Sequence, residues 1–443
     1  MIFRRKLYDK MLEWKKDWGG KYALLVKGAR RVGKSTLVEE FANKEYRSHI
    51  LIDFSMASKQ IDEVFEDYMN LDYFFLQLQT IFNVKLYERE SVIVFDEVQF
   101  KPRARQAIKH LVKDGRYDYI ETGSLISIRK NVENILIPSE EMSLTLYPMD
   151  WEEFYWATGN NIAPEQIRQA FEMKRAMGEA THRKWMREMR LYMLVGGMPQ
   201  AVSAYISNNN LQEVDRVKRQ IVELYLTDFN KIDPSGSASK MFKHIPAQLS
   251  GNSSRFMVES ALGEKKTSST DTIVYEMNES MVVNLAHHAN DPNVGLGLNG
   301  SLDTYKMFVA DTGLFVTLAF WDKSFTENTV YKKLLSDKLE ANLGYVYENL
   351  IAQMLRTSGN ELYYYTFPTG NGNKNYEIDF LLSRGNKIVP IEIKSSGYRT
   401  HKSLDVFCEK YSSRIGDRIL LYTKDYYHDG QTLCLPIYYT GLL

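Results

Sequence analysis

The stretch LLVKGARRVGKSTL, residues 24–37, has the residue types and spacing of a phosphate-binding loop. Glycines let such a loop wrap, so that backbone N–H groups and the start of the next helix face phosphate oxygens. Lys34 reaches the β- and γ-phosphates, and the Ser35 hydroxyl is the predicted Mg²⁺ ligand. ATP and Mg²⁺ are therefore the expected cofactors. The predicted nucleotide-binding residues are Gly28, Gly33, Lys34, Ser35 and Thr36.

Two carboxylates follow an apolar run in SVIVFDEVQ, residues 91–99. A run without polar residues predicts a strand buried on both faces of a parallel sheet. At the end of that strand Asp96 can hold Mg²⁺, and Glu97 can polarise an attacking water, so the pair predicts hydrolysis of ATP. The next strand-like run ends at Thr122 to Ser124, where a hydroxyl either senses the γ-phosphate or belongs to a plain turn. Ser124 is the predicted nucleotide contact there.

A second set of charged residues lies in NYEIDFLLSRGNKIVPIEIKSSG, residues 375–397, which reads as two strands joined by a turn. Strand alternation puts Glu377 and Asp379 on one face of the first strand. The same rule puts Glu392 and Lys394 on one face of the second. Such a hairpin is either the solvent-facing side of a sheet or a metal site made of hard oxygen ligands.

The elements that must position these residues form a predicted multidomain α/β fold. Strand-like and helix-like runs alternate over residues 22–147, which predicts a parallel sheet covered by helices. Residues 164–232 are almost purely helical in pattern, and Asp-Pro-Ser-Gly at 233–236 indicates a boundary. A mixed small domain follows, and the chain beyond residue 331 predicts a small α/β domain of its own.

Composition sets broad limits on the class of protein. A chain of 443 residues is longer than one hydrophobic core usually organises, so several domains are expected. The net charge is zero, which demands no nucleic-acid partner but leaves room for a local basic groove. Two cysteines without CxxC spacing predict a reducing, cytoplasmic location and no structural zinc. The apolar runs are too short to span a bilayer, so no membrane association is expected.

The motifs together resemble a family of prokaryotic AAA-type ATPases fused to a C-terminal domain of unknown function with a restriction-endonuclease-like, PD-(D/E)xK core. The resemblance spans nearly the whole chain, in the order of the family. The stretches that carry it are GARRVGKST (28–36), VIVFDEVQ (92–99), DGRYDYIETGS (114–124), LYPMDWEEF (146–154), YMLVGGMPQAV (192–202), YKMFVADTGL (305–314), EIDFLL and IEIKSS.

The resemblance implies four domains and a second site. The implied domains are a P-loop AAA-type ATPase domain (1–150), a helical lid (151–234), a winged-helix-like domain (235–330) and a restriction-endonuclease-like domain (331–443). The signature of the last is a helix glutamate, a strand aspartate and ExK on the next strand. It implies that Lys394 orients the attacking water on a bound Mg²⁺. The implied Mg²⁺ ligands are Glu348, Asp379 and Glu392.

Two functions stay open at this point. One is a Mg²⁺-dependent ATPase that acts on DNA and cleaves phosphodiesters with its C-terminal domain. The other is a nucleotide-gated signalling or interaction switch whose nuclease-like domain is inactive. Arginines close to the phosphate site can neutralise transition-state charge within one chain or from a second copy in a homo-oligomer, although each taken singly is better explained as a surface residue. They are Arg30, Arg31, Arg103 and Arg105.

Overall fold

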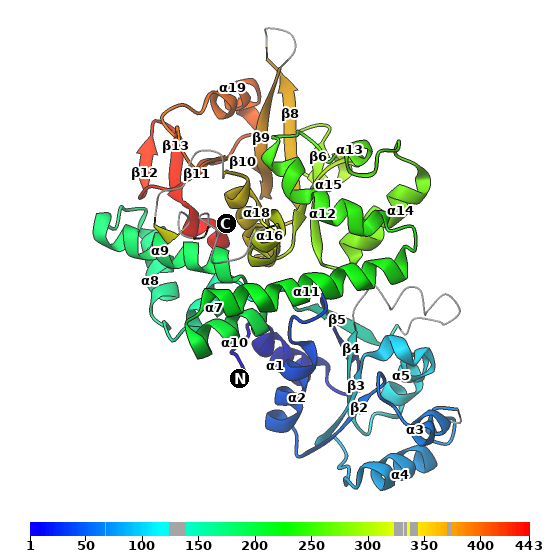
Figure 1. The fold of residues 1–443 in the computed structure, drawn as a ribbon. Helices are drawn as coiled ribbons and strands as arrows, with labels where there is room; N and C mark the ends of the chain where they lie inside the picture. Colours follow the sequence, from blue (N-terminus) through cyan, green and yellow to red (C-terminus); the bar gives the residue numbers. More distant parts are fainter. Residues whose placement is uncertain (67, 124–138, 323–330, 332–334, 337–343, 370–373) are drawn as a thin grey trace. The chain divides into compact units, whose positions relative to one another are not determined.

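The structure is a computed structural model, and its described residues form two compact units (Figure 1). Unit 1 holds residues 1–147 together with 279–281, and unit 2 holds residues 148–278 together with 282–443. The end of unit 1 therefore lies close to the domain end expected near residue 150. The residues that the structure describes are 1–66, 68–123, 139–322, 331, 335–336, 344–369 and 374–443.

Unit 1 is a parallel five-stranded sheet between two layers of helices. The strand order is β2–β3–β4–β1–β5, and every neighbouring pair runs parallel. In Figure 1, α1 and α2 lie on one side of the strands and α3, α4 and α5 on the other, which confirms the predicted parallel α/β sheet. The bounds are α1 Leu7–Trp18, β1 Ala23–Lys27, α2 Lys34–Glu45, β2 Ser48–Asp53, α3 Lys59–Val64, α4 Leu71–Phe82, β3 Ser91–Asp96, η1 Val98–Phe100, α5 Pro102–Asp114, β4 Asp118–Gly123 and β5 Glu141–Thr145.

The core of unit 1 explains why β3 carries so few polar residues. Every residue of β3 is buried, because helices cover both faces of the sheet. On one face Phe95 packs against Phe54 and Phe65, and Phe65 meets Phe74 edge to face. Aromatic pairs of this kind add to the stabilisation that their buried area provides. The polar residues Asp96 and Glu97 are thereby confined to the end of the strand.

Unit 2 begins with a series of helices, as the periodicity predicts for this part of the chain. Helix α7 starts with a capping box, in which Asp150 and Glu153 each accept a backbone N–H of the other residue. The long helix α11 buries Val214, Ile221 and Tyr225 along one face. The bounds are α7 Trp151–Ala157, α8 Ala163–Met173, α9 Glu179–Val195, α10 Pro199–Asn208 and α11 Leu211–Ile232.

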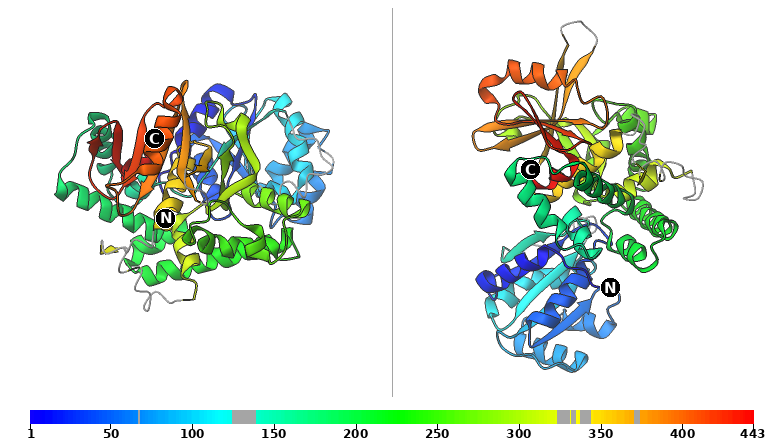
Figure 2. Two further views of the ribbon diagram at one scale, coloured as in Figure 1. Left: turned by 90° about the horizontal axis from the view of Figure 1, so that it is seen from above. Right: turned by 90° about the vertical axis from the view of Figure 1, so that its left-hand side faces the viewer.

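An eight-stranded sheet organises the rest of unit 2, in the order β12–β13–β11–β10–β9–β8–β6–β7. In Figures 1 and 2 the hairpin of β8 and β9 (orange) projects beyond the other strands. The remaining bounds are α12 Ser237–Ser250, α13 Val258–Leu262, α14 Ser268–Glu279, β6 Val283–Ala289, α15 Leu296–Asn299, β7 Gly300–Val309, α16 Thr312–Ala319, α18 Gly344–Thr357, β8 Leu362–Pro368, β9 Asn375–Arg384, β10 Lys387–Lys394, α19 Lys402–Lys410, η3 Ser412–Arg414, β11 Arg418–Tyr422, β12 Tyr427–Asp429, β13 Thr432–Pro436 and η4 Ile437–Leu442.

This sheet differs from the expectation of two separate domains meeting near residue 331. Strands β6 and β7 come from the segment expected to be winged-helix-like, and they pair antiparallel. The other edge of β6 pairs in parallel with β8 of the C-terminal segment. The free N–H and C=O groups at the edge of the β6–β7 hairpin are thus satisfied by the C-terminal strands. The two segments share one sheet.

Two of the sequence motifs meet in unit 2 in a contact that only glycine permits. A Cβ on Gly313 would lie 2.6 Å from the Cα of Gly196, so the backbones of the two motifs touch. The buried Asp311 carboxylate accepts the Gly197 N–H at 2.6 Å and the Leu314 N–H at 2.9 Å. The stretches YMLVGGMPQAV and YKMFVADTGL therefore build the core of unit 2.

The Lys218 side chain of α11 joins the same contact. Its ammonium donates to the carbonyls of Leu194 and Gly313, at 2.6 and 3.2 Å. Burial lowers the pKa of Lys218 to about 8, although Asp215 and Asp311 act to raise it. An ammonium with a lowered pKa costs folding free energy at neutral pH.

We predict that alkaline pH stabilises the wild type relative to Lys218→Met. Below the folded pKa of about 8, Lys218 is protonated in the folded and the unfolded chain, and its burial cost is fully present. Between this value and 10.5 the unfolded chain holds the extra proton, so the free energy of unfolding rises with pH, by about 3 kcal/mol in total. Thermal unfolding of both proteins from about pH 7.5 to about pH 9.5 measures the difference. Equal pH dependence in the two proteins would contradict the prediction.

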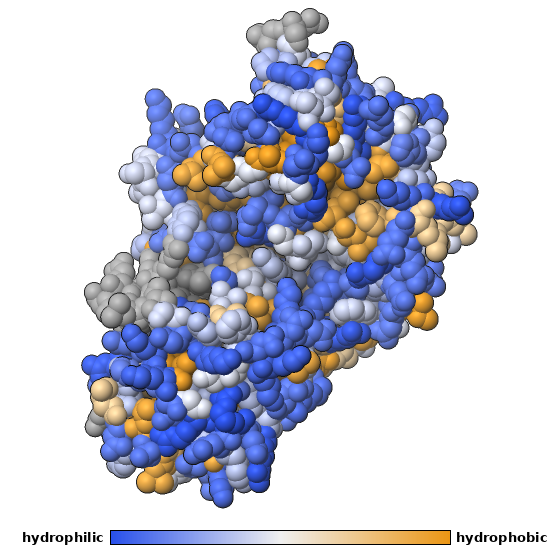
Figure 3. All heavy atoms as spheres, turned by 180° about the vertical axis from the view of Figure 1, so that it is seen from behind, coloured by the Kyte–Doolittle hydropathy of each residue, from blue (hydrophilic) through white to orange (hydrophobic). Residues whose placement is uncertain are grey.

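Among the described residues, no helix has both the length and the apolar character needed to cross a bilayer. On the face shown in Figure 3, hydrophilic residues prevail and apolar residues form separate patches.

Candidate functional site

The phosphate loop of unit 1 connects β1 to α2, which begins at Lys34. Gly33 has a φ of 96°, a left-handed conformation that glycine adopts without strain. A Cβ on Gly28 would lie 2.2 Å from the carbonyl oxygen of Leu146, so glycine alone allows this close approach. The strand–loop–helix context predicted for the motif is present, and the two glycines each have a steric reason.

The Lys34 side chain binds backbone carbonyls of the phosphate loop. It is 5% exposed, and its Nζ donates to the carbonyl oxygens of Gly28 and Ala29, each at 3.1 Å. Burial lowers the pKa of Lys34, while Glu97 and Asp96 act to raise it. The buried ammonium therefore has carbonyl partners that a phosphate oxygen can replace.

Hydroxyl groups from two elements converge on Asp96 at the end of β3. Ser35 in the first turn of α2 donates to Asp96 Oδ1 at 2.9 Å, and Thr122 of β4 donates to the same oxygen. Thr122 Oγ1 also accepts the Glu97 N–H at 3.2 Å. The structure thus brings Ser35, Asp96 and Glu97 together as expected. Thr122 is the described hydroxyl at this point, and Ser124 lies outside the described residues.

Three further candidate residues of the phosphate site are Glu97 after β3, Thr36 in α2 and Arg31 in the loop. Glu97 has a left-handed backbone with a φ of 53°, and its carboxylate accepts a bond from Gln99. Non-glycine residues in this conformation are uncommon and gather at functional sites. Thr36 is exposed in the first turn of α2, and Arg31 is exposed within the loop.

The arginines that follow the acidic pair have structural partners. Arg105 was expected at the surface or at the phosphates, but its guanidinium is buried and binds Glu141 through two bonds of 2.9 and 3.1 Å. Burial and the neighbouring Glu141 raise the pKa of Glu121 beside this pair. Arg103 forms an ion pair with Glu66. Arg105 is therefore a core residue of unit 1, held inside by its carboxylate partner.

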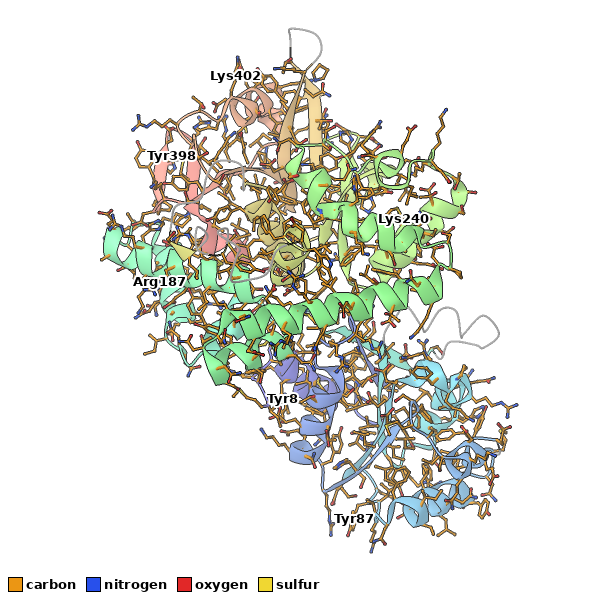
Figure 4. The ribbon with its side chains drawn as sticks, in the orientation of Figure 1. Tyr8, Tyr87, Arg187, Lys240, Tyr398 and Lys402 are labelled. Carbon is orange, nitrogen blue, oxygen red and sulfur yellow. The ribbon has the colours of Figure 1, made fainter. Side chains whose placement is uncertain are left out.

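Arg5 anchors the phosphate loop, and the sequence carries no signal for this role. Its guanidinium donates to the carbonyl of Val32 at 2.9 Å and to that of Tyr147 at 2.6 Å. The first of these carbonyls belongs to the loop, and the second follows β5. In the helix after Arg5, Tyr8 donates to Glu45 Oε1 at 2.6 Å and holds α1 against α2 (Figure 4). A single arginine near the start of a chain has no motif, so only the fold reveals it.

Unit 2 contains a cluster of three carboxylates. Glu348 of α18 and Glu377 and Asp379 of β9 each offer one oxygen atom, and these atoms lie within 4.8 Å of one another. Glu348 and Asp379 were both predicted from the sequence as Mg²⁺ ligands, and the structure brings them together. Glu377 joins them, as the alternation within its strand indicates. The three residues are called the carboxylate cluster below.

A bulge in β9 directs Asp379 into the cluster. Opposite the single residue Tyr364 of β8, β9 has the two residues Asp379 and Phe380. Bulges of this kind turn side chains and are frequent next to functional sites. The Oδ2 atom of Asp379 also accepts the Ile393 N–H at 2.7 Å, which fixes the carboxylate against β10.

The carboxylate cluster opens on a pocket of about 420 Å³. Glu348 and Asp379 line it, together with polar side chains that include Ser250 and Asn252. Burial and then the Glu348 charge raise the pKa of Asp379, and Lys306 opposes this. Carboxylate oxygens beside a polar pocket are the donor set that Mg²⁺ and Mn²⁺ prefer, so the residues fit a divalent ion.

Lys306 of β7 supplies a cation to the carboxylate cluster. Its Nζ lies 2.8 Å from Glu348 Oε1 and also binds Glu377 Oε1. Burial acts to lower the pKa of Lys306, but the charges of Glu348, Glu377 and Asp379 outweigh it and raise the pKa overall. The sequence shows Lys306 only as one lysine between Tyr305 and Met307, which gives no indication of its partners.

Glu392 and Lys394, predicted to complete this site, bind each other instead. Lys394 Nζ lies 2.8 Å from Glu392 Oε1, and Glu392 Oε2 accepts the Leu404 N–H of α19 at 3.2 Å. Among the described residues, the group of possible metal ligands is Glu348, Glu377 and Asp379.

Comparison with known proteins identifies the first domain. Residues 20–155 match a family model described as an AAA domain. This part of the chain is therefore similar to AAA-type domains. Its loop, its Asp96 and its parallel sheet are those of a nucleotide-binding fold. Residues 186–324 and 343–439 match two further models, each described only as a domain of unknown function. The AAA-type domain is thus followed by domains without an assigned role, in the order that the resemblance implied.

Individual relatives are distant. An uncharacterized protein of Methanocaldococcus jannaschii is 21% identical over 271 residues, which cover 58% of this chain and 54% of that protein. The chain therefore spans about half the length of this relative. The Thermotoga maritima RuvB Holliday junction branch migration motor has a TM-score of 0.29 at 14% identity, over 63% of this chain and 89% of its own. AMPPCP-bound DnaA from Aquifex aeolicus has a TM-score of 0.28 at 11% identity, over 62% and 88%. Scores this low carry no argument, and the assignment rests on the AAA domain match.

We predict that Arg5→Met weakens nucleotide binding about 10-fold, because the phosphate loop loses two charge-assisted bonds that fix its backbone. Titration with a fluorescent ATP analogue measures the affinity. Lys10→Met, at an exposed position of α1, is the matched control and should bind like the wild type. An unchanged affinity in Arg5→Met would show that Arg5 only attaches the start of the chain.

Proposed function

We propose that the protein binds and hydrolyses ATP with Mg²⁺, and that it uses this activity to act on DNA. The observation that carries the first part is the convergence of Lys34, Ser35 and Asp96 at the start of α2. The Ser35 hydroxyl and the Asp96 carboxylate are hard oxygen donors 2.9 Å apart, so they fit a magnesium ion. Bound Mg²⁺ would neutralise charge on the β- and γ-phosphates.

The other residues of this site have distinct roles in the proposed reaction. Lys34 exchanges its bonds to the loop carbonyls for bonds to phosphate oxygens, and Arg5 holds the loop in the conformation that receives them. Glu97 orients the attacking water, and Thr122 keeps Asp96 and the Glu97 backbone in register. An arginine from a second copy of the chain is part of the proposal if the protein works as a homo-oligomer.

We expect Lys34→Ala to lose ATP hydrolysis by ~100-fold or more, because the charge on the transferred phosphoryl group loses its cation. Glu97→Gln should still bind ATP while hydrolysing it as slowly. Phosphate release with and without Mg²⁺ measures both. Lys109→Ala, at an exposed position of α5, is the matched control. Full hydrolysis by the Lys34 variant would mean that another protein is responsible for the activity.

The order of elements in unit 2 supports the DNA part of the proposal. Helices α12, α13 and α14 are followed by the β6–β7 hairpin, the order of a winged helix. In such modules one helix enters a groove of the duplex while nearby residues contact phosphates. Around the start of α14, Lys265, Ser268 and Ser269 are exposed and suited to phosphate contacts.

The carboxylate cluster supports a second reaction, metal-dependent cleavage of phosphodiesters. Its three oxygens and the adjoining pocket of about 420 Å³ carry this part of the proposal. Glu348, Glu377 and Asp379 would hold Mg²⁺, which supplies an activated water and stabilises charge on the phosphate. In this part of the proposal Lys394 is the lysine that orients water, the role that the restriction-endonuclease-like signature assigns to it.

We predict that the purified protein nicks supercoiled plasmid with Mg²⁺ or Mn²⁺, and that EDTA stops it. Asp379→Asn should reduce nicking at least ~100-fold, because the charge that binds the ion is lost. Lys394→Ala should also reduce it. The matched control is Asp417→Asn, an exposed carboxylate in the same unit. Nicking that survives both Asp379→Asn and Lys394→Ala would come from a contaminant and would remove the nuclease assignment.

A nucleotide-gated switch with an inactive nuclease-like domain is the second candidate. The contact between Lys306 and the carboxylate cluster favours it, because a buried lysine stands where a nuclease needs a metal ion. The pairing of Lys394 with Glu392 points the same way. ATP hydrolysis together with a complete lack of metal-dependent nicking would establish this alternative.

A further inference from the structure

A lysine from outside the C-terminal segment reaches the carboxylate cluster across the sheet. Strand β7 is separated from β9 by β6 and β8. The cross-strand neighbour of Lys306 on β6 is Ala286, whose side chain is short enough to let the lysine pass. The Lys306 ammonium then lies 5.6 Å from the ring centre of Tyr364 on β8 before it meets Glu348 and Glu377.

The carboxylate cluster requires a cation for electrostatic reasons. Three carboxylates with oxygens within 4.8 Å repel one another, and none of the three side chains is fully exposed to water. Lys306 is itself only 5% exposed, and burying an ammonium is unfavourable unless it is paired. The lysine and the carboxylates therefore stabilise each other. The structure shows this cluster already binding one cation, and that cation is part of the chain.

We propose that Lys306 is a tethered cation that holds the place of a divalent metal ion and leaves when the ion binds. This inference rests on the proposed function, in which Glu348, Glu377 and Asp379 hold such an ion. An ammonium hydrogen-bonded to Glu348 and Glu377 occupies the space between these two carboxylates. A divalent ion entering the same space meets strong repulsion from it, so the two cations exclude each other.

The metal ion and the Lys306 ammonium reach the carboxylate cluster from different parts of the fold. The pocket lined by Glu348 and Asp379 lets a hydrated ion approach the cluster. Lys306 comes from β7, on the far side of β6 and β8 from β9. Because β7 belongs to the hairpin that follows the proposed DNA-binding helices, a shift of β7 changes the affinity of the cluster for metal. Metal binding in the C-terminal segment is thereby coupled to a strand of the preceding one.

The test measures Mn²⁺ binding by electron paramagnetic resonance on the full chain without nucleotide. All proteins carry Asp96→Asn, so that the phosphate site loses the carboxylate that would hold a metal ion. We expect Lys306→Met to bind Mn²⁺ at least ~10-fold more tightly than the parent, because the competing charge is gone and the side chain keeps its length. Lys240→Met, at an exposed position of α12 labelled in Figure 4, should bind like the parent.

The ligand assignment is tested in the same experiment. Adding Asp379→Asn to Lys306→Met should abolish the gain in affinity. If Lys306→Met and the parent bind Mn²⁺ equally, with Asp379→Asn weaker, the tethered-cation inference is wrong and the metal site remains. If neither the parent nor Lys306→Met binds Mn²⁺ more tightly than the protein carrying Asp379→Asn, the metal site and the nuclease proposal are both wrong.

A second comparison covers the case in which Lys306→Met does not fold without metal. Lys306→Met combined with Glu377→Gln removes one positive and one negative charge, which limits the repulsion among the remaining carboxylates. This double variant should bind Mn²⁺ at least ~5-fold more tightly than Glu377→Gln alone. Mn²⁺ should also raise its unfolding temperature more than that of Glu377→Gln. Equal affinities and equal shifts in this pair overturn the inference.

Discussion

Both candidate sites depend on the compensation of carboxylate charge that is partly or fully removed from water. In unit 1 the Asp96 carboxylate receives hydrogen bonds from Ser35 and Thr122 at the end of a buried strand. In unit 2 the Lys306 ammonium binds two of the three carboxylates of the cluster, Glu348 and Glu377. A carboxylate that already has partners within the fold can exchange them for a bound ligand without disturbing the core.

The groups that compensate the carboxylates at the two sites differ in how readily a ligand replaces them. A hydroxyl is neutral and can turn toward a metal ion while its oxygen remains in place, so Ser35 can change partner from Asp96 to Mg²⁺ at little cost. An ammonium is itself a cation and has to be removed. The groups at the phosphate site can therefore turn to a ligand in place, whereas the carboxylate cluster already binds a cation that has to be displaced.

The same difference decides what could be predicted from the sequence. The phosphate loop is local, and its glycines, Lys34 and Ser35 follow one another in a fixed order, so their spacing was sufficient. Asp96 was predictable because a wholly apolar run ends at it. Lys306 was not, since its partners are more than forty residues away along the chain. The bulge in β9 had no signal in the sequence either. Pairing between β6 and β8 has no local signal either.

The shared sheet has a consequence for anyone who dissects the molecule. A fragment that begins near residue 331 looks like a complete domain in the sequence, but it would lack both β6 and Lys306. The long edge of β8 would then present unpaired backbone groups, an arrangement that favours aggregation. Its acidic residues would also repel one another. Biochemical properties measured on such a fragment would describe a polypeptide deprived of its own counter-ion, and they would not transfer to the intact chain.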